Sequence, residues 1–416
     1  MIKDVLIYLS AFIGVFAVAY YFLSLRAYRK TEKLRDFKES ELPKVSIIIP
    51  AYNEEETIKK TIESALNLEY PKEKIEVIVV DDGSKDRTYT IASSIKNSRL
   101  RVFTKTNGGK AKALNFAIFR THGEIIVTMD ADSYAEPDSL RKMVDYFTTE
   151  RVMCVTPSMV IHDPKGFWQR IQQVEYLVGI FLRKSFSTMN AIHVTPGAFS
   201  SYRRIFFEKY GGFDESGNLT EDMEMALRIQ SKGYSLRCSD ESVVFTKAPK
   251  KFGELVRQRR RWYYGWIQNL LLYNKLFSKR FGHLGLIVLP VAVISILLSA
   301  ILTLFVVFST LSNVLKELNY LQSIHFSFSG IFNISWFSIE RFFFYFFSKP
   351  TSIILLVFLG IVIGYMVFAK RRVKKYSDVY VGMALFVITY SILLTFWWLL
   401  SIFYYFVVKK VSWGKQ

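Results

Sequence analysis

Four long apolar stretches constrain the fold of this 416-residue chain more than any other feature. Residues from about 5 to 25 form a run close to the roughly 20 residues that a helix needs to cross a bilayer. Three more candidate spans follow at about 284–311, 351–368 and 379–408. The polar middle of the chain has to fold in water. We therefore expect a soluble domain inserted between α-helical transmembrane segments.

Basic residues predict how these spans are oriented. Positive charge follows the first run directly, at Arg26, Arg29, Lys30, Lys33 and Arg35. By the positive-inside rule, this predicts a multi-pass plasma-membrane protein with its amino terminus outside and its soluble domain in the cytosol. A cleaved signal peptide is the alternative, because residues 17–19 resemble a cleavage site. The apolar run continues past that point, which favours an anchor.

The carboxy-terminal third contains two features that bear on this topology. A second basic cluster, at Lys370, Arg371, Arg372, Lys374 and Lys375, agrees with a cytosolic turn, whereas Lys409 and Lys410 would lie outside. The aromatic stretch 328–347 is predicted to be interfacial or re-entrant, because a crossing there would place the basic cluster outside. The predicted domains are an anchor (1–30), a soluble domain (31–250), interfacial helices (251–282) and a membrane region of about three spans (283–416).

Composition limits the class of partner. Lys and Arg (55) exceed Asp and Glu (36), giving a net charge of +19, and apolar residues make up 51% of the chain. The basic excess gathers beside the apolar segments, which favours lipid headgroups and phosphorylated substrates over nucleic acid. Cys154 and Cys238 indicate no disulfide framework, and the histidines show no metal-ligand spacing.

The middle of the chain has the pattern of an α/β domain. Short β-branched runs at 45–49, 76–80 and 125–129 alternate with helical stretches such as 54–68 and 110–120. This alternation predicts βαβ units and a parallel sheet. Ligands bind such sheets beyond the carboxyl ends of the strands, and the acidic motifs of this chain lie there.

Two motifs follow the first two predicted strands. Tyr52 and Glu54 are placed to stack on a base and to accept a hydrogen bond from it; the alternative is a turn in which Asn53 caps the next helix. Asp81 and Asp82 precede a glycine and are expected to face a ligand's donors. The alternative is that one of them caps a helix beginning near residue 86.

The next two motifs suit phosphate and a metal ion. Lys110 follows two glycines at a predicted helix start, where backbone donors and a lysine together favour phosphate, although no Walker A pattern surrounds it. Asp130 and Asp132 directly follow a strand. Two carboxylates at a strand end provide oxygen ligands for Mg²⁺ or Mn²⁺, with phosphate oxygens and water completing the shell.

Three further segments complete the candidate site. Asp222 begins a helix after Thr220-Glu221, where it is either a cap or a general base. Thr195-Pro196-Gly197 predicts a tight turn that presents an acceptor. Gln258, Arg261 and Trp262 fall at i, i+3 and i+4, so that one helix face would carry all three and could cover a sugar diphosphate. The alternative is a basic helix end on lipid headgroups, aided by Lys250, Lys251 and Arg257.

These motifs, in this order from Val45 to Trp262, resemble the family 2 glycosyltransferases of the Rossmann-like GT-A fold, and in particular the membrane-embedded processive cellulose, hyaluronan and poly-N-acetylglucosamine synthases. The resemblance implies an inverting, metal-dependent transfer from a nucleoside-diphosphate sugar, expected to be UDP-linked. It assigns the catalytic base to Asp222 and the metal to Asp132 with Asp130. Donor contacts are implied for Tyr52, Glu54, Asp81, Asp82, Lys110, Asp130, Gln258, Arg261 and Trp262. Acceptor contacts are implied for Thr195, Pro196, Gly197, Glu221 and Trp262.

Two alternatives stay open at this point. The acceptor is either a growing polysaccharide, with export through the spans, or a lipid such as a polyprenyl phosphate or glycolipid. The sequence Gln258–Trp262 favours the polymer, because the family's single-transfer lipid enzymes usually lack it. A transporter or receptor that only binds nucleotides is a remote alternative. An ion pathway would require charges within the spans, and almost none occur.

Overall fold

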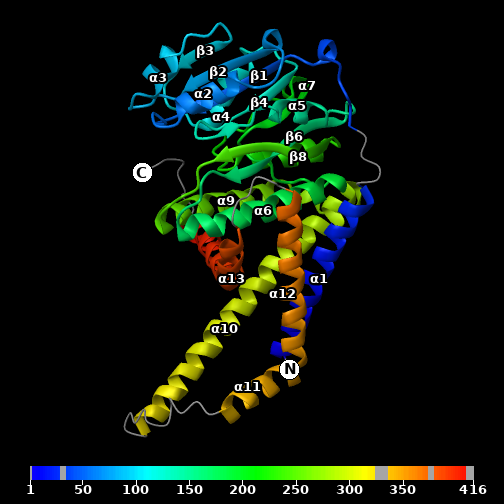
Figure 1. The fold of residues 1–416 in the computed structure, drawn as a ribbon, viewed down its shortest axis with the longest axis vertical. Coiled ribbons are helices and arrows are strands. Elements are labelled where there is room, and N and C mark those ends of the chain that lie inside the picture. The colour runs from blue at the N-terminus through cyan, green and yellow to red at the C-terminus, as the bar shows by residue number, and fades with distance from the viewer. Residues whose placement is uncertain (1, 29–33, 324–335, 373–378, 409–416) are drawn as a thin grey trace.

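The computed structural model describes residues 2–28, 34–323, 336–372 and 379–408. A sheet domain lies at one end of the molecule, long helices extend from the other, and two helices lie flat between them (Figure 1). The predictions that rest on Arg29, Lys30, Lys33, Lys374, Lys375, Lys409, Lys410 and residues 328–335 fall outside the described residues.

The centre of the soluble domain is an eight-stranded sheet in the order β3-β2-β1-β4-β7-β6-β8-β5. Its parallel half is formed by β1 (Val45–Ala51), β2 (Ile75–Asp81), β3 (Leu100–Thr104) and β4 (Ile125–Thr128). The other half contains β5 (Tyr134–Ala135), β6 (Val152–Ile161), β7 (Ser200–Arg203) and β8 (Ser235–Thr246).

The prediction of a parallel sheet is wrong for part of this sheet, which is mixed. β7 runs antiparallel to both β4 and β6, and β5 runs antiparallel to β8. The reason lies in the turn before β7: Gly197 lies against Asp130 beyond the end of β4, so that β7 enters the sheet from that same edge and must run backwards. The strand alternation that predicted parallel pairing was confined to residues 45–129.

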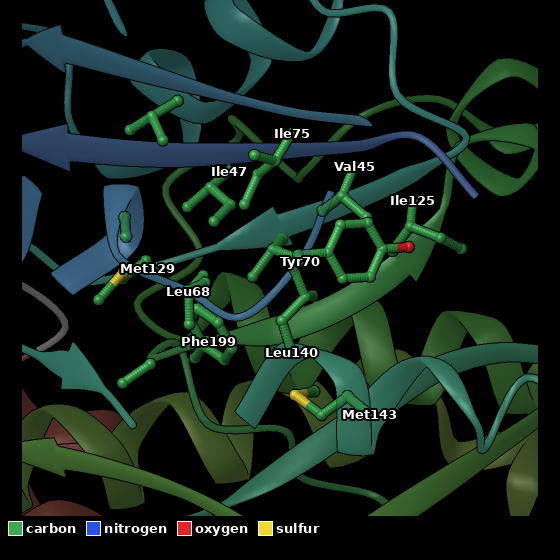
Figure 2. Close-up of a cluster of buried hydrophobic side chains, with 14 of the residues drawn as sticks. Val45, Ile47, Leu68, Tyr70, Ile75, Ile125, Met129, Leu140, Met143 and Phe199 are labelled. Atoms are coloured by element: carbon green, nitrogen blue, oxygen red, sulfur yellow. The ribbon is translucent and has the colours of Figure 1, made fainter. Parts of the chain in front are cut away.

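Both faces of the sheet are covered because the strands are apolar on both sides. On β1, Ile47 packs in one cluster and Ile48 in the other. The first face carries α2 (Ile58–Leu66), α3 (Thr88–Ser94) and α5 (Ser139–Val144). The second carries α4 (Lys110–Ile118), α7 (Arg204–Tyr210) and α8 (Glu221–Ser231). Figure 2 shows part of the first cluster, in which residues of β1 and β4 meet Leu140 and Met143 of α5.

Two helices, α6 (Phe167–Thr188) and α9 (Phe252–Leu272), form a platform between the sheet and the long helices (Figure 1). Lys184 of α6 forms a buried ion pair with Asp240 of β8 at 2.9 Å. On its other side α6 packs against α13 (Tyr380–Phe403), where a Cβ on Gly382 would lie 2.8 Å from the carbonyl oxygen of Arg170. The glycine therefore lets the two helices cross closely.

Within the described residues, four helical segments are long and apolar enough to cross a membrane, by length and composition: Asp4–Ala27, Leu284–Ser323, Pro350–Arg371 and Tyr380–Val408. They match the four predicted spans. They are formed by α1 (Ile2–Tyr28), α10 (Leu289–Ser323), α12 (Pro350–Arg372) and α13 (Tyr380–Phe403), with π-helical segments at Leu284–Val288 and Tyr404–Val408. Short 3-10 turns lie at Glu39–Glu41, Lys72–Lys74, Asn274–Leu276 and Lys279–Phe281.

The described part of the aromatic stretch forms α11 (Trp336–Ser348). Its 13 residues are fewer than the roughly 20 that a crossing requires. In Figure 1 it lies at the far end of α12, away from the sheet. The interfacial position and the predicted domain boundaries stay predictions.

Candidate active site

The first acidic pair, at the end of β2, is buried and fully engaged with its own loops. The carboxylate of Asp82 accepts hydrogen bonds from the backbone amides of Gly108 (3.0 Å) and Gly109 (2.7 Å) and from Nζ of Lys105 (2.6 Å). Asp81 accepts from Oγ1 of Thr104 at 2.9 Å. These carboxylates therefore fix the loop that leads into α4, in the manner of backbone capping.

Neither aspartate caps the following helix, so that alternative was wrong. α3 begins at Thr88, and its first amide donates to Oδ1 of Asp86 at 2.9 Å. Asn53 does not cap a helix either, because α2 begins at Ile58 after Thr57. The Asn53 side chain instead accepts from the backbone amide of Lys85 at 2.8 Å. It thereby joins the two loops that follow β1 and β2.

Tyr52 and Glu54 lie in this first loop and are both half-buried. The backbone amide of Glu54 donates to Oγ1 of Thr88 at 2.7 Å, and its carboxylate accepts from Oγ1 of Thr57 at 2.9 Å. The loop is thus held at the carboxyl ends of β1 and β2. Its position is the one predicted for a group that contacts a nucleotide.

Lys110 joins the remaining acidic motifs. Its Nζ lies 2.6 Å from Oδ1 of Asp130 and 3.2 Å from Oε1 of Glu221. A Cβ on Gly197 would lie 2.5 Å from the same Nζ, so that the Thr195-Pro196-Gly197 turn packs closely against this amine and a side chain there would displace it. Oγ1 of Thr195 donates to the backbone carbonyl of Asp222 at 2.7 Å. Four segments distant in the sequence therefore meet at one amine.

The charges around Lys110 are unbalanced in favour of carboxylates. Burial, with the negative charges of Asp130 and Glu54, raises the pKa of Asp132 to about 6. Burial, with the charge of Glu221, raises the pKa of Asp222 to about 7. Burial lowers the pKa of Lys110, but its carboxylate neighbours outweigh this effect and raise it overall. Crowded carboxylates of this kind favour a bound cation or proton.

The donor set suits a hard divalent ion shared with a ligand. Within the ranges that the structure describes, no three His, Cys, Asp or Glu side chains are grouped to hold a metal by themselves. Asp132 and Asp130 provide carboxylate oxygens, the ligand type that Mg²⁺ and Mn²⁺ prefer. The two carboxylates lie close enough for the charge of Asp130 to raise the pKa of Asp132, so both can serve one ion. The residues present therefore fit a metal whose shell is completed by diphosphate oxygens.

Helix α9 packs directly on the segment that carries Asp222. A Cβ on Gly265 would lie 2.3 Å from Oγ1 of Thr220, and Nδ2 of Asn269 donates to that oxygen at 2.9 Å. One turn earlier, Trp262 packs beside Tyr176 of α6. The charge of Asp132 also acts on the Tyr176 hydroxyl. α9 therefore meets the segment before Asp222 at Gly265 and the Tyr176 cluster at Trp262, and the joining of Trp262, Asp132 and Asp222 in one site stays a prediction.

The arginine that α9 buries is one that the sequence reading missed. Gln258 and Arg261 are half-buried, whereas Arg259 is fully buried and its Nη2 donates to Oε2 of Glu175 at 2.6 Å. Helical spacing could have predicted the burial of Arg259. It follows the buried Leu255 by four residues and precedes Trp262 by three, so that these side chains lie on one side of the helix. The whole contribution of α6, including Glu175 and Tyr176, was also missed.

A cavity of about 490 Å³ lies elsewhere, between α4 and α8. It is lined by Asn115, Gly212, Phe213, Asp214, Glu215, Ser216, Glu224, Arg228 and Leu272. None of these is a predicted site residue. The cavity is therefore separate from the site around Lys110.

Residues 46–211 match the family described as glycosyl transferase family 2. This segment is a family 2 glycosyltransferase domain. It contains the first four motifs and the Thr195–Gly197 turn, whereas Asp222 and α9 follow it. The predicted family 2 domain is confirmed for residues 46–211.

Relatives of this glycosyltransferase domain differ in the acceptor that their names state. The chain is 31% identical over 310 residues to a beta-monoglucosyldiacylglycerol synthase of Trichormus variabilis, which covers 70% of this chain and 65% of that protein. It is 28% identical over 282 residues to a poly-beta-1,6-N-acetyl-D-glucosamine synthase of Staphylococcus aureus, covering 66% of this chain and 67% of that protein. The matched regions span 55% to 65% of the first three curated relatives.

A solved structure confirms the predicted fold class. A mannosyltransferase of Pyrobaculum calidifontis, in complex with GDP-Man and Mn²⁺, superposes with a TM-score of 0.53 at 21% identity, covering 74% of this chain and 92% of that one. At this identity the likeness concerns the fold alone. The glycosyltransferase domain thus has the GT-A architecture, with candidate membrane helices before and after it.

Proposed function

We propose that this chain is an inverting, metal-dependent glycosyltransferase that moves a sugar from a nucleoside-diphosphate sugar, UDP-linked, to the hydroxyl of a growing polysaccharide. One observation carries the proposal. The amine of Lys110 lies 2.6 Å from a carboxylate oxygen of Asp130 and 3.2 Å from one of Glu221, so that the metal-ligand motif and the base motif meet at one cation. A donor diphosphate and an acceptor hydroxyl both have to reach such a point.

Asp222 is the proposed base. Its raised pKa of about 7 leaves about half of the carboxylate unprotonated at neutral pH and makes it basic enough to accept a proton from an attacking hydroxyl. The hydroxyl attacks the anomeric carbon on the face opposite the leaving diphosphate, in one displacement. The backbone carbonyl of Asp222 is bound by Thr195, which fixes the start of α8 against the acceptor turn.

The donor is proposed to bind along the carboxyl ends of β1, β2 and β4. Tyr52 and Glu54 would contact the base, while Asp81 and Asp82 keep the loop before Lys110 in shape. Asp132, with Asp130, would hold Mg²⁺ or Mn²⁺, which supplies charge stabilisation to the leaving diphosphate. Lys110 and Arg261 would stabilise the same charge as it develops.

The acceptor is proposed to lie under α9, between Trp262, Glu221 and the Thr195–Gly197 turn. Trp262 is half-buried and offers its ring to a sugar. Beyond it, α9 meets α13 in close aromatic contacts, with ring centroids of Tyr263 and Trp398 at 4.4 Å. These contacts lead from the site toward the spans, which supports coupling of polymer synthesis to export.

A lipid acceptor is the second candidate, supported by the diacylglycerol relative. In either case we propose a plasma-membrane protein with a cytosolic site and an outside amino terminus. Arg26, in the last turn of α1, supports this orientation. The platform helices lie between the sheet and the membrane-length helices (Figure 1), which supports a site beside the bilayer that a lipid or a membrane-bound polymer can reach.

The purified chain in detergent tests these proposals. It is assayed for nucleoside diphosphate release with UDP-glucose, UDP-N-acetylglucosamine and GDP-mannose, each with Mg²⁺, with Mn²⁺ and with chelator. Diacylglycerol and an N-acetylglucosamine tetramer serve as acceptors, and products are sized on a gel. We expect metal-dependent release from one UDP-sugar with a polymer ladder. A single glycolipid band would favour the lipid acceptor, and binding without release from any donor would favour a transporter or receptor.

A further inference from the structure

The junction of α6, α9 and α13 contains a buried charge pair to which the proposed chemistry assigns no role. Arg259 of α9 is 0% exposed, and the side chain of Glu175 on α6 is 15% exposed. Tyr390 of α13 lies against both charges. Burying two charges loses their hydration, and apolar residues of similar volume often serve stability as well or better. The pair therefore calls for an explanation other than packing.

The guanidinium of Arg259 lies over an aromatic ring of the proposed acceptor site. Its central carbon is 4.1 Å from the centroid of Trp262, three residues further along the same helix, and 5.7 Å from that of Trp397 on α13. Among the residues that the structure describes, the Nε and Nη1 atoms of Arg259 have no hydrogen-bond partner. Aromatic faces thus replace polar partners around this cation, in a cation–π arrangement that is stronger when desolvated.

This geometry limits how the Trp262 ring can move. One face of the indole is covered by the guanidinium, and the guanidinium is held in turn by Glu175 at 2.6 Å. The other helix of the platform, α6, therefore determines where the ring lies. Trp262 remains half-buried, so part of its surface stays open to a ligand.

We propose that Arg259 and Glu175 are positioning residues that fix the Trp262 ring for the acceptor sugar. The inference rests on the proposed function, in which Trp262 stacks on that sugar. Arg259 acts only through Trp262 and touches neither donor nor metal. A planar guanidinium is required for this task, because a lysine ammonium keeps the charge but cannot stack on the ring or present the same fork of donors.

A double-mutant cycle tests the inference with the full chain in detergent. Arg259→Lys is made in the wild type and in Trp262→Ala. Glu175→Gln is a second variant, because it removes the charge that holds the Arg259 guanidinium. Arg257→Lys is the matched control, since Arg257 is exposed on the same helix. Two quantities are measured, the KM for the acceptor and the KM for the UDP-sugar donor. The acceptor is the one that the wild type uses, either diacylglycerol or an N-acetylglucosamine tetramer.

We expect Arg259→Lys and Glu175→Gln to raise the acceptor KM about tenfold, with a donor KM within about twofold of the wild type. In the Trp262→Ala background, Arg259→Lys should change the acceptor KM less than about twofold. An equal change in both backgrounds, or a donor KM that rises in step, would show a merely structural pair and overturn the inference. Absence of turnover in the wild type itself would instead remove the proposed function, and this inference with it.

Discussion

The two acidic regions of the site have opposite electrostatic characters. Around β2, the carboxylates of Asp81 and Asp82 are saturated by donors from their own loops. Around Lys110, Asp132 and Asp222 are crowded by other carboxylates and have pKa values raised to about 6 and about 7. In the first region both carboxylates therefore have donors within the protein. In the second region the carboxylates repel one another, which is typical of groups arranged to bind a cation and a proton rather than for stability.

The largest expected effect separates the base from the rest of the site. Asp222→Asn keeps the shape of the side chain but removes its ability to accept a proton, so kcat should fall on the order of 10²- to 10⁴-fold. UDP binding with Mn²⁺, measured by calorimetry, should change less than about threefold. The exposed Asp163→Asn serves as control. A parallel loss of UDP binding and turnover would contradict the role given to Asp222.

The next effect concerns the metal. Asp132→Ala should lower kcat/KM on the order of 100-fold, because a cation at the leaving diphosphate contributes several kcal/mol. Titration of Mn²⁺ in the presence of UDP should show the weakened binding directly. Glu208→Ala, on the exposed side of α7, is the control. Unchanged metal affinity in Asp132→Ala would refute the ligand assignment.

A dependence on pH follows from the second region alone. Asp222 must be unprotonated to accept a proton, and its pKa is about 7. Hence kcat/KM should level off about one pH unit above 7, be about half-maximal near pH 7 and fall toward tenfold per pH unit well below it. Asp132 takes up its proton near pH 6, which also weakens metal binding on the acid side. A rate that rises as the pH drops from 7 to 5 would contradict both assignments.

The smallest effect on chemistry is expected in the first region. Asp82→Asn removes the negative charge and one of the two acceptor oxygens that serve the amides of Gly108 and Gly109 and the amine of Lys105. The part-buried amides are then poorly paired, at a cost of about 1 kcal/mol in stability. The melting temperature in detergent should fall, while kcat at saturating donor should fall less than about tenfold. If Asp82→Asn instead matched Asp222→Asn in kcat with no loss of stability, the contrast between the two regions would be lost.

Much of this arrangement was predictable because it depends on local patterns. The β-branched runs that became β1, β2 and β4 each end at an acidic motif, and parallel strands bring their carboxyl ends to one edge. The four membrane-length helices followed from length and apolarity. The family resemblance added the order of the motifs and the roles proposed for them.

The remainder depended on contacts that no local pattern encodes. The sequence of Asp81-Asp82 is the same whether the carboxylates face a ligand or the amides of Gly108 and Gly109, and only the fold shows the latter. The reversal of β7 depends on where the Gly197 turn meets Lys110. The run of three arginines does not show which of them is buried. The partner of Arg259, Glu175, lies 84 residues away on a helix whose sequence is typical of a core helix.

A structure of the chain bound to UDP and Mn²⁺ tests the central claim most directly. The account predicts Mn²⁺ about 2.1 Å from a carboxylate oxygen of Asp132, with the diphosphate lying between that ion and Lys110 and below Trp262. UDP bound instead in the cavity lined by Asn115 and Glu224, or a metal away from Asp132, would contradict it.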